Sequence, residues 1–173
     1  MSKLKVAVGP VLFLWQKTYL EQFYNKVMLS EAECVYLGET VCGKRRLARL
    51  NDYLVWAEEL AKAGKEVVLS SLTLLESSAQ LQDLKRLSKH KQYLFEANDL
   101  SAVQLLYQLG LPFVIGPAIN VYNGYTLAKF AKMGAVRWVM PVELSKDWLL
   151  ALQQEYAQLC DLPLSLIHIS EPT

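Results

Sequence analysis

Hydrophobic and polar positions follow one repeating order along the chain: a short apolar run, a polar turn, and then a stretch with apolar residues at helical spacing. The apolar runs lie at residues 5–8, 34–37, 66–70, 93–96, 113–116 and 136–140. Short, continuously apolar runs are typical of parallel strands that helices cover on both faces. The pattern therefore predicts an α/β protein with about six βα units in succession.

The stretch after the first run predicts a helix whose start and buried face can both be read. Leu20, Phe23, Tyr24 and Val27 fall on one face of this helix. Thr18, followed three residues later by Glu21, has the spacing of a capping box, in which each side chain accepts a hydrogen bond from the backbone of the other residue. Thr18 is therefore the expected N-cap.

Later helices carry similar signals. Gly64 is expected to end the second helix, because glycine readily adopts the backbone conformation that follows a helix. Leu100, Val103 and Tyr107 are expected on the buried side of a helix in the second half of the chain. Ser145 is the expected N-cap of the last helix.

Two architectures accommodate consecutive βα units: an open doubly wound sheet and a (β/α)₈ barrel cut short. A complete barrel needs roughly 250 residues and eight units, whereas this chain has 173 residues. An open sheet that binds nucleotides would carry a glycine-rich phosphate-binding fingerprint, and no such motif occurs. We therefore expect an incomplete (β/α)₈ TIM-like barrel over residues 1–163.

Composition narrows the function classes. The chain is 53% hydrophobic and 20% charged, which excludes a disordered protein, and its net charge of +1 leaves no electrostatic footprint for nucleic acid. Its three cysteines form no Cys-x-x-Cys pair, which excludes a disulfide scaffold and a zinc ribbon. No secretory signal and no uninterrupted apolar span of about 20 residues is visible. We expect a cytoplasmic protein.

Polar residues recur where the predicted strands end. In parallel α/β folds the reactive groups collect at the carboxyl ends of the strands. In chain order, these positions are Glu39, Cys42, Ser70, Ser71, Glu96, Asn98, Asn120, Tyr122, Asn123 and Glu143. We expect them to surround a wet cavity for a small polar or aromatic ligand. The expected substrate contacts are Glu39, Asn120, Tyr122 and Glu143.

Cys42 is the strongest single candidate for chemistry. It follows the second apolar run in a loop with the cationic residues 44–46, and nearby cations stabilise the thiolate that acts as a nucleophile or metal ligand. The same cations could instead hold a carboxylate or phosphate, or be solvated. Cys34 is expected to be buried in a strand, and Cys160 to be inert. His90 is expected to be exposed, which leaves no Ser–His or Cys–His triad.

Several segments resemble one known family. They are residues 9–12 with Trp15, and residues 35–39, 41–46, 96–100, 120–123 and 137–148. These segments resemble the collagenase-like peptidase family (family 32 of the peptidases of unassigned mechanism), in its ubiquinone-biosynthesis, UbiV-like branch. The resemblance implies an iron–sulfur protein that acts with a homologous UbiU-like subunit, as a heterodimer, in oxygen-independent hydroxylation of a ubiquinone precursor. It also implies a UbiT-like lipid-binding accessory protein as a partner.

The resemblance further implies a 4Fe-4S cluster held by four cysteines. Cys42 matches the first ligand position, and the other three ligands of the family lie beyond the part of the sequence that this chain covers. Neither Cys34 nor Cys160 matches a ligand position. Because such a cluster needs four thiolates, we expect the chain by itself to be inactive and to bind no stable cluster.

Other functions stay open at this point. The chain could be another member of the same family, either a peptidase or an RNA-modification hydroxylation factor. It could also be a non-catalytic scaffold or electron-transfer subunit. Glu96 and Glu143 are a possible carboxylate pair for glycoside hydrolysis, but the sequence leaves their separation undetermined.

Residues 164–173 break the rhythm of the chain. Only residues 165–169 could form a seventh strand there, and the ten residues resemble the translation of a transposase-based sequencing adapter. We expect residues 164–173 to be a non-native tail. The authentic sequence is then expected to stop near Pro163 in this chain, with the gene continuing beyond it.

Overall fold

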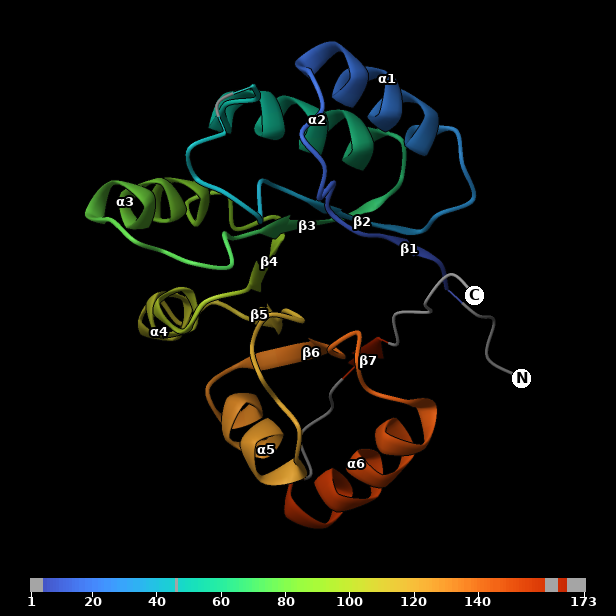
Figure 1. The fold of residues 1–173 in the computed structure, drawn as a ribbon, viewed down its shortest axis with the longest axis vertical. Helices are drawn as coiled ribbons and strands as arrows, with labels where there is room; N and C mark the ends of the chain where they lie inside the picture. The colour runs from blue at the N-terminus through green and yellow to red at the C-terminus, as the bar shows by residue number, and fades with distance from the viewer. Residues whose placement is uncertain (1–4, 46, 161–164, 168–173) are drawn as a thin grey trace. The chain divides into compact units, whose positions relative to one another are not determined.

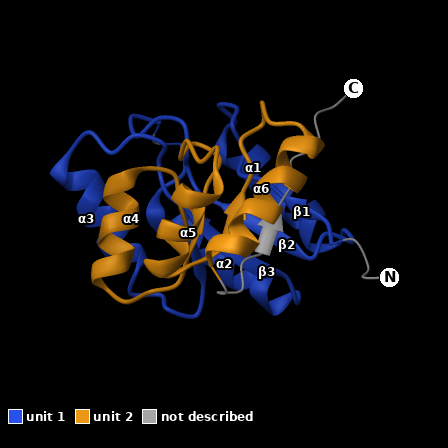
Figure 2. Cartoon of the chain, turned by 90° about the horizontal axis from the view of Figure 1, so that it is seen from below, with its two compact units in different colours: residues 1–95 blue, residues 96–173 orange. Residues whose placement is uncertain are grey.

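The computed structural model describes residues 5–45, 47–160 and 165–167. The chain divides into two compact units, residues 1–95 and residues 96–173 (Figure 2). Strands and helices alternate through both units, and the strand pairs within each unit are parallel. The predicted fold class is confirmed: this is an α/β protein with the strand–helix repeat of an incomplete (β/α)₈ TIM-like barrel.

The first unit contains three parallel strands in sequence order. They are β1 (Ala7–Val8), β2 (Cys34–Leu37) and β3 (Glu66–Ser70). Its helices are α1 (Lys17–Met28), α2 (Leu50–Lys62) and α3 (Ser78–Leu87). Helices α1 and α2 lie side by side over the same face of these strands (Figure 1). Strand β4 (Leu94–Ala97) lies at the boundary of the two units.

The second unit repeats this arrangement. Its strands are β5 (Phe113–Ile115), β6 (Ala135–Val139) and β7 (Ser165–Ile167). Its helices are α4 (Leu100–Gln108), α5 (Gly124–Lys132) and α6 (Lys146–Leu159). Helices α5 and α6 pack against each other on one side of β6 (Figure 1).

Strand β7 is the described part of the segment 164–173. It pairs in parallel with β6, with Arg137 opposite Ser165 and Val139 opposite Ile167. The other residues of the segment lie outside the described residues. A seventh strand therefore forms where the strand–helix repeat calls for one. The non-native origin of residues 164–173 stays a prediction.

Aromatic side chains join α1 to α2 in the core of the first unit. Tyr24 and Trp56 lie with ring centroids 5.2 Å apart, and Trp56 meets Tyr53 edge to face at 5.4 Å. Leu20, Tyr24 and Val27 are buried, as their spacing predicts, whereas Phe23 on the same face is half-buried. Burying a large apolar side chain stabilises a fold by about 1.5–3 kcal/mol, so this contact fixes the two helices against each other.

In the first unit, one predicted helix end is confirmed and one predicted helix start is wrong. Gly64 follows α2 with φ of 84°, as expected. The prediction of a capping box at Thr18 is wrong, because α1 begins at Lys17, directly after Gln16, and no side chain caps the helix. The helix therefore starts two residues earlier than predicted, and the Lys17 ammonium in its first turn bonds to Asp52 on α2. A capping box does form in α3, between Ser77 and Gln80.

The second unit also corrects one expectation. Val103 is buried in α4, but Leu100 and Tyr107 are exposed, with 64% and 50% of their surface accessible. The buried face is instead formed by Ala102, Val103, Leu105 and Leu106. Ser101, Gln104 and Gln108 form the polar face of α4, and the apolar side opposite them is wider than the part that is buried, so Leu100 and Tyr107 stay exposed at its edge. Ser145 caps α6 as predicted, accepting a hydrogen bond from the Trp148 backbone.

No helix among the described residues is both long enough and apolar enough to cross a membrane.

The tightest backbone approach in the first unit lies at the end of β2. A Cβ atom on Gly38 would come closer than 3.0 Å to the backbone carbonyl oxygen of Ser70, at the end of β3. Because backbone cannot move aside as a flexible side chain can, only glycine fits there.

We predict that Gly38→Ala lowers the free energy of unfolding by roughly 1–3 kcal/mol, since the added methyl group forces the ends of β2 and β3 apart. Urea denaturation measures the change. Gly9→Ala is the matched control, because a Cβ atom there meets nothing within 4 Å. Equal stability of the two variants would contradict the prediction.

Candidate functional site

The loop after β2 is shaped by one carboxylate. Glu39 Oε1 accepts hydrogen bonds from the backbone N–H groups of Val41 (2.9 Å) and Cys42 (3.1 Å). The Arg45 guanidinium lies 3.8 Å from the same oxygen and donates to the Leu12 carbonyl at 2.9 Å. Glu39 therefore holds the turn that carries Cys42, and Arg45 ties that turn to the loop after β1.

Cys42 lies in this turn with its side chain half-exposed. The Cys42 carbonyl accepts a hydrogen bond from the Arg45 backbone at 3.0 Å, which closes the turn on itself. Cys34 is buried in β2, as expected, and Cys160 is half-exposed at the end of α6. Of the two cysteines in the first unit, Cys42 is thus the one that solvent or a metal centre can reach.

The metal-binding capacity of the described residues is limited. They contain no group of three or more His, Cys, Asp or Glu side chains that could hold a metal ion. A 4Fe-4S cluster takes four thiolates, and Cys42 offers one. The described residues therefore do not fit a complete cluster.

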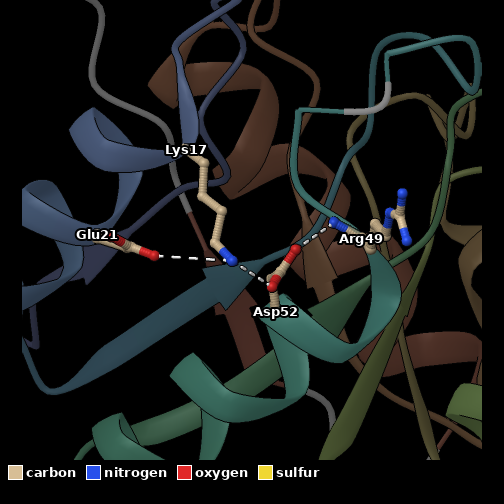
Figure 3. Close-up of polar contacts among 4 residues, drawn as sticks. All are labelled: Lys17, Glu21, Arg49 and Asp52. Carbon is tan, nitrogen blue, oxygen red and sulfur yellow. Dashed lines mark hydrogen bonds and ion pairs between the residues drawn. The ribbon is translucent and has the colours of Figure 1, made fainter.

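A polar cluster fixes the two helices that flank this loop (Figure 3). The Lys17 ammonium at the start of α1 lies 2.7 Å from Asp52 Oδ1 in the first turn of α2 and 3.8 Å from Glu21. The second Asp52 oxygen accepts the Arg49 backbone N–H at 2.7 Å. The bond from Lys17, and then that from Arg49, hold the pKa of Asp52 below its ordinary 3.8.

Because the pKa of Asp52 is lowered on folding, its charge stabilises the fold above pH 3.8 and this contribution is lost as the pH falls through the lowered value. We predict that Asp52→Asn costs about 0.5–1 kcal/mol at pH 7 and that the difference from the unmodified protein shrinks below pH 3.8. Urea denaturation across this pH range measures it. The exposed pair partner Glu58 gives the control Glu58→Gln, for which we expect a smaller loss. An undiminished Asp52→Asn difference at pH 3 would refute the mechanism.

A cavity of about 160 Å³ lies within the first unit, between α2, α3 and the carboxyl ends of β2 and β3. Glu39, Ser70 and Ser71 line it, so three of the predicted strand-end residues do meet at one place. Cys42 is not among the described residues of its wall, although its neighbours Gly43 and Arg45 are.

In the second unit, the structure brings Tyr122 and Glu143 together. The Tyr122 hydroxyl donates a short hydrogen bond to Glu143 Oε1, and the Trp148 indole N–H donates to the Tyr122 carbonyl at 3.1 Å. This bond lowers the pKa of Glu143 and raises the pKa of Tyr122. Asn123 caps α5 through the Thr126 backbone N–H, which is a structural role.

Glu96 and Asn98 form a second polar pair, but not in a wet site. Both are 3% exposed, and Asn98 Nδ2 donates to Glu96 Oε2 at 2.9 Å. A Cβ atom on Gly116 would strike the Asn98 side chain, so glycine at the end of β5 makes room for the amide. The expectation that these two residues belong to a wet cavity is therefore not met, because both side chains are shielded from water.

The other residues singled out in the sequence lie at separate places in the two units. Asn120 is exposed in the loop between β5 and α5, and Glu39 belongs to the first unit. His90 is half-buried rather than exposed, beside a surface pocket that Glu58 and Tyr93 also line. The sequence did not mark Trp148, which contacts Tyr122. No spacing signal identifies it, because the contact joins the loop before α5 to the first turn of α6, 26 positions later.

We predict that Tyr122→Phe raises the pKa of the Glu143 carboxyl toward its ordinary 4.5, because the hydrogen bond that favours the charged form is removed. Carboxyl-detected NMR titration measures this pKa. Tyr125, exposed in the first turn of α5, gives the control Tyr125→Phe, which leaves the Glu143 pKa unchanged. A Glu143 pKa that is the same in all three proteins would contradict the prediction.

Comparison with known proteins identifies the family. Residues 20–164 match Peptidase family U32, and the chain belongs to this family. The fold is similar to that of the U32 peptidase Mk0906, with a TM-score of 0.63 and 11% identity over 96% of this chain and 69% of that one. It is also similar to a mandelate racemase/muconate lactonizing enzyme from Roseiflexus sp., with a TM-score of 0.62 and 12% identity over 97% of this chain and 49% of that one.

Proposed function

We propose that this chain is the N-terminal part of a UbiV-like iron–sulfur protein that acts with a UbiU-like subunit in oxygen-independent hydroxylation during ubiquinone biosynthesis. Membership of Peptidase family U32 supports the broader assignment. The observation that supports the UbiV-like assignment is the position of Cys42. It is a half-exposed thiol in the turn after β2, which Glu39 and Arg45 hold in place.

In this proposal Cys42 is one of four thiolate ligands of a 4Fe-4S cluster, and the other three come from the longer protein. The structure of the turn suits this role. The hydrogen bond from the Cys42 backbone to Glu39 fixes where the turn presents the side chain.

The proposed substrate contacts are Glu39, Asn120, Tyr122 and Glu143. A UbiT-like lipid-binding protein is the proposed accessory partner. The Tyr122–Glu143 pair supports a role in contact with a polar or aromatic group, because a charged carboxylate and a neutral phenol hydroxyl are presented together in an exposed position.

We predict that the longer protein, purified without oxygen together with its partner, holds about four iron atoms per polypeptide and that Cys42→Ala lowers this content severely. Cys160→Ala is the matched control, because Cys160 is equally half-exposed but lies at the end of α6. Iron and sulfide analysis with electron paramagnetic resonance measures the cluster. A full cluster in Cys42→Ala would overturn the assignment of this ligand.

The function itself is tested in cells that lack their own copy of the gene. We expect the unmodified longer protein to restore anaerobic quinone synthesis and Cys42→Ala to fail. Restored quinone synthesis with Cys42→Ala, or none with the unmodified protein, would overturn the function. Single substitutions of the four proposed substrate contacts are tested in the same assay. Unchanged quinone synthesis in all four variants would refute their role in substrate binding.

A further inference from the structure

The loop after β1 exposes four consecutive apolar residues. Leu12, Phe13 and Leu14 have 56%, 74% and 62% of their surface accessible, and Trp15 has 38%. No other run of three consecutive exposed apolar residues occurs in the part of the chain that the structure describes. Contiguous exposed apolar side chains mark interaction sites, because they gain free energy only when something removes them from water.

The exposed side chains sit on a turn that is fixed at its base. The Trp15 backbone N–H donates to the Phe13 carbonyl at 3.0 Å, which closes a tight turn around Leu14. The Trp15 ring packs edge to face on Phe23 of α1, with ring centroids 5.6 Å apart. The turn is therefore anchored through Trp15, while Phe13 and Leu14 are left exposed beside the anchor.

The loop after β2 lies against this turn and brings positive charge to it. Arg45 Nη1 donates to the Leu12 carbonyl at 2.9 Å, which joins the two loops. Residues 10–20 and 40–51 contain no Asp or Glu. Their basic residues are Lys17, Lys44, Arg45, Arg46 and Arg49. The apolar turn is thus accompanied by cations and by no acidic residue of either stretch.

Two of these cations are left for a partner. Lys17 already pairs with Asp52, and Arg45 with the neighbouring loop. Lys44 and Arg49 are exposed and form no ion pair within the described residues. Figure 3 shows the Arg49 guanidinium directed away from the Asp52 carboxylate. An anionic partner can therefore reach both side chains.

The form of the surface favours a lipid partner over a folded protein. A stable protein interface covers about 800 Å² on each partner, and one turn with four partly exposed side chains offers less. An apolar projection with cations beside it matches the surface of an anionic bilayer, where apolar groups enter the boundary of the acyl chains and Lys and Arg stay among the headgroups.

We propose that the loop after β1 inserts Phe13 and Leu14 into the surface of an anionic lipid bilayer, with Lys44 and Arg49 at the headgroups. This inference goes beyond the proposed iron–sulfur function and does not depend on it. None of the four residues is a proposed cluster ligand or substrate contact, so the failure of one proposal leaves the other standing.

The test measures co-sedimentation of the full chain with vesicles of phosphatidylcholine alone and of phosphatidylcholine mixed with phosphatidylglycerol. We expect saturable binding to the mixed vesicles, weaker binding to phosphatidylcholine, and a loss of the difference at high salt, which screens exposed charges. Equal binding to both vesicles at low salt, or no saturable binding to the mixed vesicles, overturns the proposal.

Substitutions locate the contact. Phe13→Ser should lower the partition coefficient on mixed vesicles by about 10-fold or more, because one large apolar side chain no longer leaves water. Leu29→Ser is the matched control: Leu29 is 91% exposed but lies at the other end of α1, so binding should be unchanged. An unchanged partition coefficient in Phe13→Ser, or an equal loss in Leu29→Ser, overturns the proposal.

The charge is tested in the same way. Lys44→Gln should lower binding to mixed vesicles by about 3- to 10-fold, as expected for one cation near an anionic surface, and leave binding to phosphatidylcholine unchanged. Lys26→Gln, in the last turn of α1, is the control and should bind as the unmodified chain does. Equal effects of the two substitutions overturn the role of Lys44.

Two further outcomes separate a bilayer from other partners of the turn. If the chain self-associates without lipid and Phe13→Ser disperses the oligomer, the turn binds a second copy and the proposal is overturned. The longer protein should bind mixed vesicles as this chain does. If only the 173-residue chain binds, the rest of the polypeptide covers the turn, and the proposal is overturned as well.

Discussion

The parallel pairing of β2 with β3 is the constraint on which the first unit depends. Leu37 lies opposite Leu69 in this ladder, and all four residues of β2 and the last four of β3 are buried. Backbone groups that are removed from water must pair with each other, which holds the two strands in register. Because the strands are parallel, both end at the same edge, and Glu39 and Ser70 emerge there together.

The close approach of Gly38 to Ser70 and the bonds of Glu39 follow from this register. With the strand ends this close, the next residues have to turn, and the Glu39 carboxylate satisfies two of the backbone N–H groups of that turn. The Lys17–Asp52 pair joins α1 to the first turn of α2, which follows the loop. Backbone and charge contacts thus connect the strand ends to the turn that carries Cys42.

The second unit contains two polar side-chain pairs that differ in burial. The buried pair of Glu96 and Asn98 packs against Gly116 at the ends of β4 and β5, whereas Tyr122 and Glu143 pair in exposed loops. The buried pair serves packing and the exposed pair is free to meet a ligand. Residue type alone does not separate these two roles, since both pairs contain a glutamate at a strand end.

The sequence by itself determined the order and type of the elements, because a buried parallel strand must be apolar throughout and its pattern is local. It also marked Gly64, Ser145 and the burial of Cys34 correctly. The local pattern failed at Thr18, because capping-box spacing alone did not decide where α1 begins: the helix starts at Lys17, and Thr18 lies inside it. Only the tertiary structure decided which part of the wide apolar side of α4 is buried, which glutamates lie in the interior, and that Glu39, Ser70 and Ser71 line one pocket. These features depend on contacts between residues far apart in the chain, which no spacing along it records.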